Sequence, residues 1–413
     1  MRQTRLIRPD YAGRFACIGP ACEDTCCAGW SVSVDEAAYR KYTSLPAGPL
    51  RSLIDVSILP AADGSEKPGA SPSASVRMLP SGECPFLSSE RLCRIQVEHG
   101  ESYLCRTCAN YPRTTHTIDG LAETSLTLSC PEAARLVLLE PHLLPPAGAP
   151  GHCCTWDETK DQGVLKAYFW PIREFVLTLI KDRRYSLWQR LFLLGTFSRR
   201  LDALVRGEVK RSFPDMLSDF SRAIDTRGLS SAMASIPADL PLQLEVVLLL
   251  IVQRTSNAPV SSRLREVLSM FVKGIGYSPQ ASTDSLVARY ADSHAGFFAP
   301  FFLRHEYILE NYLINAVLRD LFPFGQKLFE PDAKPEPARA FAMLAIQFAL
   351  IKGLTIGVAG ARGPEFCSAD VVRTVQPAVK HFEHYGKFLL EAHAMLAAKG
   401  LDNARGLTML LRN

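Results

Sequence analysis

Residues 15–27 read FACIGPACEDTCC, and this stretch decides how the N-terminal part of the chain is organised. Its glycine and proline let the backbone turn tightly enough to direct several thiols toward one point. Nine of the twelve cysteines of the 413-residue chain precede residue 131. This density predicts a metal centre. The nine are Cys17, Cys22, Cys26, Cys27, Cys84, Cys93, Cys105, Cys108 and Cys130.

Such crowding has two chemical explanations, disulfide bonds in an oxidising compartment or thiolate ligands to a soft metal in a reducing one. The first residues, MRQTRLIRPDYAGRF, contain no apolar stretch with a small-residue cleavage site, so we expect a cytoplasmic protein with reduced thiols. A chain of 413 residues that is 47% hydrophobic can bury a core without disulfides. The composition therefore favours the metal, with oxidised or inert buried thiols as the alternative.

Zinc bound by four thiolates and an iron–sulfur cluster both fit cysteine ligands, and spacing does not separate them. The CxxxCxxC motif of radical S-adenosylmethionine enzymes is missing, because Cys27 follows Cys26 directly. Two adjacent cysteines can rarely bind one ion without strain. Either two metal sites exist or several thiols are bystanders.

Charge and hydropathy limit the partners. The formal net charge of +4 is modest for a nucleic-acid-binding protein, so we expect no nucleic acid among the partners. The apolar run from Leu240 to Val252 is interrupted by polar residues and is too short to cross a bilayer, so we interpret it as a buried helix and expect no membrane association.

The pattern predicts a mainly α protein with two parts. Residues 1–140 form a loop-rich cysteine domain with a mobile insertion near 59–80, residues 141–154 form a proline- and glycine-rich linker, and residues 155–413 form an all-helical domain. Apolar residues spaced three and four apart predict helices in the last part. These segments are 164–180, 187–205, 264–272, 301–321 and 338–351.

Two local motifs carry further expectations. Ser129 and Glu132, three apart around Pro131, predict a capping-box helix start that places Cys130 at a helix N-terminus, where a thiolate is favoured. No GxGxxG motif follows a predicted strand, so an ordinary doubly wound methyltransferase domain is not expected. The glycines of residues 357–363 are expected to end a helix and form a loop.

Three segments of the N-terminal part read FACIGPACEDTCCAGWSVSVDEAAYRKY (15–42), ECPFLSSERLCRIQVEHGESYLCRTCANYPR (83–113) and SLTLSCPEAARLVL (125–138). They closely resemble the flagellin lysine-N-methylase (FliB) family, and the N-terminal part is also similar to zinc- or iron-chelating domains with clustered cysteines. A weaker similarity continues through HEYILENYLINAVLRDLFPF (305–324).

The resemblance implies methyl transfer from S-adenosylmethionine to surface lysines of flagellin, with a cysteine-bound iron–sulfur cluster of the 4Fe-4S type. The thiols carried over by the motifs are Cys17, Cys22, Cys26, Cys27, Cys84, Cys93, Cys108 and Cys130. Cys105 is the last choice as a metal ligand, because the resemblance does not require a cysteine at its position. Cys153, Cys154 and Cys367 lie outside the motifs.

Lysine attacks a sulfonium only as the neutral amine, so the site needs a proton acceptor. Candidates are Tyr111 beside the metal, and Glu306 and Glu310, one turn apart on an apolar helix; an interhelical hydrogen-bonded network is the alternative for this helix.

For the cofactor, Arg113 is a candidate to hold the carboxylate of S-adenosylmethionine, or else it pairs with a neighbouring Glu or a sulfur. Glu23 and Asp24 are candidates for its amino group, or they belong to a solvated loop.

Two other functions remain open from the residues alone. One is a non-enzymatic metal carrier or redox sensor, and the other is a zinc-stabilised interaction module.

Overall fold

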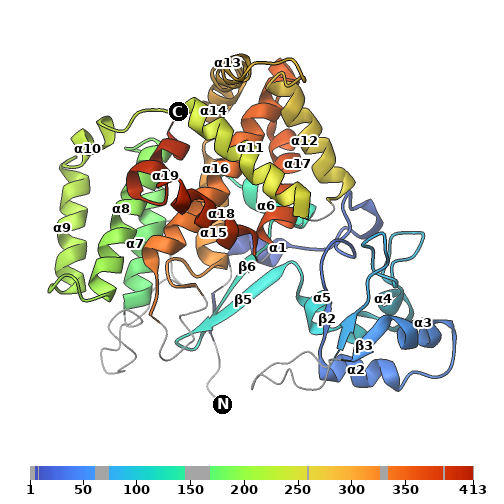
Figure 1. Cartoon of the computed structure of the whole chain (residues 1–413). Helices are drawn as coiled ribbons and strands as arrows, with labels where there is room; N and C mark the ends of the chain where they lie inside the picture. The colour runs from blue at the N-terminus through green and yellow to red at the C-terminus, as the bar shows by residue number, and fades with distance from the viewer. Residues whose placement is uncertain are drawn as a thin grey trace.

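The computed structural model describes residues 5–7, 9–60, 74–144, 168–257, 260–325, 334–384 and 387–412. It is mainly α-helical, as predicted, with a large helical body and a smaller, loop-rich unit to one side of it (Figure 1). Cys153, Cys154, most of the expected linker and most of the expected mobile insertion lie outside the described residues.

The smaller unit contains short elements around its own core. A three-stranded antiparallel sheet has the order β2-β4-β3, and its apolar side chains pack with Tyr42, Ile54 and Phe86. Asp35 accepts hydrogen bonds from the backbone amides of Ala38 and Arg106, and so caps two helices at once. The elements are β2 (Ser33–Val34), α2 (Glu36–Thr43), α3 (Pro49–Ser57), β3 (Ile58–Pro60), β4 (Ala74–Val76), α4 (Arg94–His99) and α5 (Arg106–Asn110).

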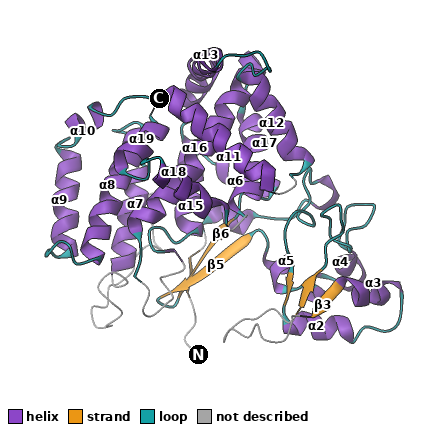
Figure 2. Cartoon of the chain, viewed as in Figure 1, coloured by secondary structure: helices purple, strands orange, loops and turns teal. Residues whose placement is uncertain are grey.

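A second sheet lies against the helical body, where Figure 2 shows its long hairpin. Its order is β1-β6-β5, with β1 parallel to β6 and β5 antiparallel to it. The hairpin turns at Asp119 and Gly120, which both have positive φ, as a two-residue turn of this kind requires. The elements are β1 (Arg5–Ile7), α1 (Asp10–Arg14), β5 (Arg113–Ile118), β6 (Leu121–Leu126) and α6 (Pro131–Leu138).

Apolar residues of the hairpin and of the adjoining helices α1 and α6 belong to the large core. Tyr11, Leu126 and Val137 are fully or almost fully buried with the helical residues, so packing joins part of residues 1–140 to the helical body. Helix α6 begins at Pro131 with Cys130 as its N-cap, as expected for the helix start. The predicted capping box is absent, because no side chain caps this helix.

Helix α16 (Pro337–Arg362) runs through the middle of the helical body and packs against most of its neighbours. The other helices are α7 (Phe169–Ile180), α8 (Leu187–Val205), α9 (Phe213–Asp225), α10 (Ser230–Ala234), α11 (Leu240–Asn257), α12 (Ser262–Gly274), α13 (Thr283–Ser293), α14 (Ala299–His305), α15 (Tyr307–Arg319), α17 (Ser368–Ala378), α18 (Phe388–Ala398) and α19 (Ala404–Leu411). Two π-helical turns, η4 (His294–Phe298) and η7 (Val379–Glu383), interrupt this series.

By length and composition α16 resembles a membrane span, but 94% of its most apolar window is buried inside the protein. Its apolar residues occupy all sides, which is typical of a helix at the centre of a core. The run that begins at Leu240 forms α11, a helix with several buried residues, as predicted.

Glycines let the neighbouring helices touch α16. A Cβ atom added to Gly274 would lie 1.7 Å from the carbonyl oxygen of Gly357, so α12 and α16 meet backbone to backbone. Gly360 similarly faces Ser293 of α13. The expectation that residues 357–363 form a loop was therefore wrong for the first two glycines, which serve packing inside the helix. Only Gly363, with φ of 60°, follows the helix end.

Gly274→Ala should destabilise the protein, because the new methyl group meets backbone that cannot move aside. Overpacking of this kind costs about 1–3 kcal/mol. The free energy of unfolding in urea measures the loss. Gly296→Ala is the matched control, because no heavy atom lies within 4 Å of its added Cβ. Equal stability of the two variants would contradict the close helix contact.

Candidate functional site

A cavity of about 510 Å³ lies where the smaller unit meets the helical body. Its walls combine aromatic, apolar and charged side chains from both parts of the chain. The residues that the argument uses are Trp30, Tyr111, Arg113, Thr127, Arg319, Glu383 and His384. A volume of this size is within the range of small-molecule sites in proteins.

His384, whose ring contacts two side-chain hydroxyls, lines this cavity. The Nε2 atom of His384 lies 2.9 Å from Ser129 Oγ and 3.1 Å from Thr127 Oγ1. Ser129 Oγ also lies 3.1 Å from the hydroxyl of Tyr111. Burial lowers the pKa of His384 below its ordinary value of 6.5. The imidazole is therefore neutral at pH 7 and able to accept a proton.

A carboxylate precedes the histidine and is fixed in place. Glu383 accepts a hydrogen bond of 2.7 Å from the hydroxyl of Tyr312 and one of 2.6 Å from Arg319. Its side chain is only 7% exposed, so the arginine compensates a buried charge. Glu383 ends the π-turn η7, and His384 follows it directly. This turn brings both groups to the cavity.

Trp30 connects the cysteine loop to the cavity. Its indole Nε1 donates a hydrogen bond of 2.6 Å to the carbonyl oxygen of Cys26. Its ring lies 5.4 Å from the ring of Tyr111, centroid to centroid. Of the sequence-predicted catalytic residues, Tyr111 thus lies at the cavity, although burial raises its pKa well above 10.0 and keeps its hydroxyl protonated.

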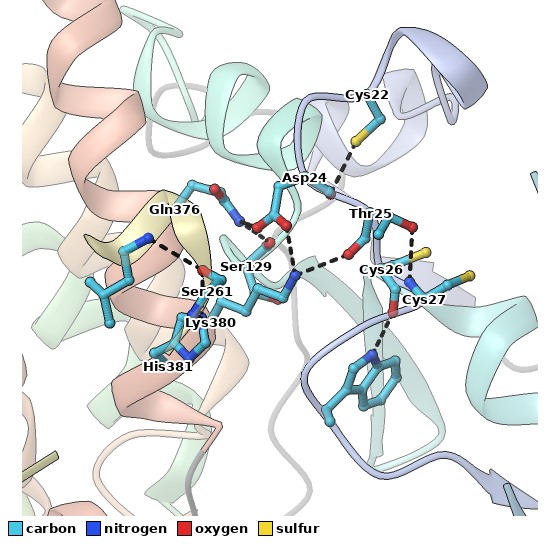
Figure 3. A network of polar contacts seen from close by, with 12 residues as sticks. Cys22, Asp24, Thr25, Cys26, Cys27, Ser129, Ser261, Gln376, Lys380 and His381 are labelled. Carbon is cyan, nitrogen blue, oxygen red and sulfur yellow. Dashed lines mark hydrogen bonds and ion pairs between the residues drawn. The ribbon is translucent and has the colours of Figure 1, made fainter. Parts of the chain in front are cut away.

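The cysteine loop is attached to the helical body by a buried ion pair (Figure 3). Lys380 Nζ lies 2.9 Å from Asp24 Oδ1 and donates to the carbonyl oxygen of Thr25 at 3.0 Å. Gln376 Nε2 donates to Asp24 Oδ2 and to the carbonyl oxygen of Ser129, both at 2.7 Å. These contacts hold residues 24–25 against the segment before α6.

Neither acidic residue proposed for the cofactor amino group lines the cavity. The side chain of Asp24 is 9% exposed and is bonded to Lys380 and Gln376. The alternative that Asp24 belongs to a solvated loop is therefore also wrong. Glu23 pairs with Arg135 of α6 at 2.6 Å. Both carboxylates are thus engaged in holding the loop.

The glutamates proposed on the helix of residues 305–324 form the interhelical network that was the alternative. Arg190, 1% exposed, pairs with Glu306 at 2.5 Å and with Glu310 at 2.6 Å. Arg183 adds a second pair to Glu310. These side chains tie α8 and the loop between α7 and α8 to α15. They do not line the cavity. A catalytic role for Glu306 and Glu310 finds no geometric support.

Arg113 lines the cavity and pairs with neither a glutamate nor a sulfur in the described part of the chain. It donates a hydrogen bond of 3.0 Å to the carbonyl oxygen of Phe15, and its guanidinium lies 4.9 Å from that ring. The remaining donors of this cation are available to a carboxylate.

The nine thiols fall into two sets. The inner set belongs to the core of the smaller unit and comprises Cys27, Cys84, Cys93, Cys105 and Cys108. The other four, Cys17, Cys22, Cys26 and Cys130, lie outside that core, although the thiol of Cys26 is hydrogen-bonded to the thiol of Cys27. Cys105, ranked last from the sequence, is buried and lies beside Cys108.

The thiols fit a soft metal by chemistry. Hydrogen bonds from neighbouring thiols lower the pKa of Cys27 and of Cys105 to about 7. Burial instead raises the pKa of Cys84 to about 12 and that of Cys130 to about 11, so those thiols need a cation to ionise. As the side chains stand, no three His, Cys, Asp or Glu residues of the described ranges converge on one point.

Residues 173–410 match the FliB lysine N-methylase C-terminal domain, a span of more than half the chain. The chain belongs to the FliB lysine N-methylase family. The lysine-N-methylases of Salmonella typhimurium and Salmonella choleraesuis are 23% identical over 381 residues and 22% identical over 378 residues, each alignment covering 88% of both chains. The flagellar biosynthetic protein FliU of Salmonella muenchen is 32% identical over 143 residues, which are 34% of this chain and 81% of FliU. No solved structure matches the chain.

The expected family and the expected enzyme class, a protein-lysine N-methyltransferase, are confirmed. The sequence interpretation missed Glu383 and His384. A signal was present, because residues 380–384 read KHFEH, a run of titratable residues in an otherwise apolar helical region. The FliB C-terminal domain therefore contributes Arg319, Glu383 and His384 to the wall of the cavity.

Lys380→Met should destabilise this FliB-family protein, because it leaves Asp24 buried without its cation. Removing one partner of a buried ion pair costs about 3–5 kcal/mol. Lys399→Met is the control: it breaks the exposed pair with Glu245 and should cost about 1 kcal/mol or less. Urea unfolding of both variants measures the difference, and similar costs would argue against the buried ion pair.

Proposed function

We propose that the chain transfers a methyl group from S-adenosylmethionine to side-chain amines of flagellin lysines, in the cavity between the smaller unit and the helical body. The single observation that carries this proposal is the position of His384 at the wall of that cavity, with its Nε2 atom 2.9 Å from Ser129 Oγ. The names of the relatives support the reaction class, and the name of FliU, a flagellar biosynthetic protein, supports a flagellar substrate. We also propose a cytoplasmic location.

The chemistry needs a neutral lysine amine. An ordinary lysine has a pKa near 10.4 and is charged at pH 7. The apolar and aromatic part of the cavity wall disfavours the charged form of the amine, and a neutral imidazole can take the proton. His384 suits this role because its Nε2 is held by the hydroxyls of Ser129 and Thr127, at 2.9 and 3.1 Å.

The transfer itself is a displacement at carbon. The lysine nitrogen donates its lone pair to the methyl carbon, the carbon–sulfur bond breaks, and its electron pair stays on the sulfur of the departing thioether. The lysine proton passes to His384 and then to solvent. Holding the two reactants in line contributes much of the rate in such a reaction.

Two features of the cavity suit a sulfonium cofactor. Trp30 and Tyr111 offer aromatic rings, which attract cations by their electron-rich faces. Arg113 offers a cation to the cofactor's carboxylate. This assignment keeps the role expected for Arg113 and gives Tyr111 a positioning role.

We further propose that the N-terminal thiols hold an iron–sulfur cluster of the 4Fe-4S type, with zinc as the alternative metal. The ligands would come from Cys17, Cys22, Cys26, Cys27, Cys84, Cys93, Cys108 and Cys130, joined by Cys105 on the basis of its position beside Cys108. When bound, such a group supplies positive charge that stabilises thiolates and holds the loops together.

The direct test is an anaerobic assay with labelled S-adenosylmethionine and flagellin, followed by mass spectrometry of the product. Methylated flagellin lysines support the proposal. A protein with its metal intact that transfers no methyl group to flagellin would overturn it.

His384→Gln should lower the methyl-transfer rate by about 10²-fold or more, because the glutamine amide cannot accept the proton. His142→Gln, at an exposed position, should leave the rate unchanged. Single-turnover rates with saturating cofactor measure the effect, and the unfolding midpoint checks that His384→Gln still folds. An unchanged rate would exclude His384 as the proton acceptor.

The pH dependence gives an independent check on the same histidine. Because burial lowers the pKa of His384 below 6.5, the neutral form persists at pH values where an exposed histidine is already protonated. The acid limb of the rate profile should therefore lie below pH 6.5 and disappear in His384→Gln. An acid limb above pH 6.5 would contradict this assignment.

A further inference from the structure

We propose that the side-chain amide of Gln347 binds the adenine base of S-adenosylmethionine in the cavity between the smaller unit and the helical body. The residue belongs to α16 and lines this cavity. This inference rests on the proposed function and deepens it, because it assigns the residue that selects the base of the cofactor.

Gln347 is a buried polar residue whose amide makes no hydrogen bond. Only 6% of the residue is exposed, and its side chain has no hydrogen-bond partner among the described residues. A buried amide without a partner is unfavourable, so such groups are nearly always hydrogen-bonded. Because Gln347 lines the cavity, a bound ligand can supply the missing partner.

The other two buried glutamines of the described structure have structural roles. Gln243 donates hydrogen bonds to the backbone carbonyl oxygens of residues 409 and 412. Gln376 donates to Asp24 and to the segment before α6. Each of these amides joins two parts of the chain. Gln347 differs from both, because it joins nothing and adjoins the cavity instead.

The amide of Gln347 belongs to a mostly apolar part of the cavity wall. One face of α16 lines the cavity, because its four lining residues are spaced as i, i+3, i+4 and i+7. They are Ala340, Met343, Leu344 and Gln347. Phe322 adds an aromatic ring to the lining. A wall that is apolar apart from one amide suits a flat aromatic base with a polar edge.

Adenine matches a glutamine amide in both directions. Its exocyclic amino group donates to the amide oxygen, and an adjacent ring nitrogen accepts from the amide nitrogen, which is how glutamine recognises adenine in DNA. The carboxylate and the sulfonium of the cofactor already have partners in the proposed site, Arg113 and the rings of Trp30 and Tyr111. Asn110 also lines the cavity, but it is exposed, so water can satisfy its amide.

The test measures ligand binding to the full-length protein by isothermal titration calorimetry. The probes are S-adenosylmethionine, adenosine, ATP, and purine riboside, which lacks the exocyclic amino group of adenosine. The unmodified protein should bind adenosine about 10- to 100-fold more tightly than purine riboside, which is the discrimination that a two-point contact with adenine gives. S-Adenosylmethionine should bind most tightly of the four, and tighter binding of ATP would overturn its assignment as the ligand.

Gln347→Met nearly preserves the shape of the side chain and removes both of its hydrogen-bonding groups. The variant should lose the preference for adenosine and bind S-adenosylmethionine about 10- to 100-fold more weakly. Gln280→Met is the matched control, because this glutamine is exposed and lies outside the cavity, so all four affinities should stay unchanged. Equal affinity for S-adenosylmethionine in Gln347→Met and in the unmodified protein would overturn the proposal.

Unfolding in urea provides a second readout. Because Gln347→Met removes an unpaired polar group from a buried position, its unfolding midpoint should equal or exceed that of the unmodified protein. A lower midpoint would indicate that the amide has a structural partner and would contradict the proposal.

The two proposals fail in different ways. Binding of S-adenosylmethionine that depends on Gln347, without methyl transfer to flagellin, would support the adenine site and overturn only the proposed activity. Methyl transfer with unchanged cofactor affinity in Gln347→Met would support the activity and overturn only the adenine site.

Discussion

The ion pair between Lys380 and Asp24 crosses the boundary between the cysteine loop and the helical body, and both of its charges are buried. Burying two charges is unfavourable unless their partners and hydrogen bonds are complete. Gln376 and the carbonyl oxygen of Thr25 complete them here. The position of the loop, and with it Cys26 and Trp30, follows from this arrangement.

The same ion pair also helps to position Glu383 and His384 at the wall of the cavity. Lys380 lies in η7, the π-turn that ends at Glu383, and Pro377 immediately precedes this region in α17. A π-turn contains one extra residue per turn, so it changes which side chains face a neighbour, and such turns are frequent at functional sites. Because Lys380 and His384 belong to one short segment, the contact that fixes the loop also orients the histidine toward Ser129.

The sequence predicted the helices where the apolar pattern was strong. The segment 187–205 forms α8 at those bounds, because a regular apolar stripe and a serine cap act locally. The hairpin of residues 113–126 was missed, although Asp119 and Gly120 are a typical two-residue turn. The site was less predictable than the fold. Glu310 and His384 are both polar residues in apolar helical regions, so the local sequence does not distinguish their roles. The distinction comes from partners distant in the chain: Glu310 pairs with Arg190 between helices, whereas His384 contacts Ser129 at the cavity.

The contact between Gly274 and Gly357 limits how the helical body can move. Helices usually slide past one another by switching side-chain rotamers across a layer of interlocking side chains. Between α12 and α16 there is no such layer at the crossing point, because backbone meets backbone. The close approach of the two backbones therefore restricts sliding of α12 along α16.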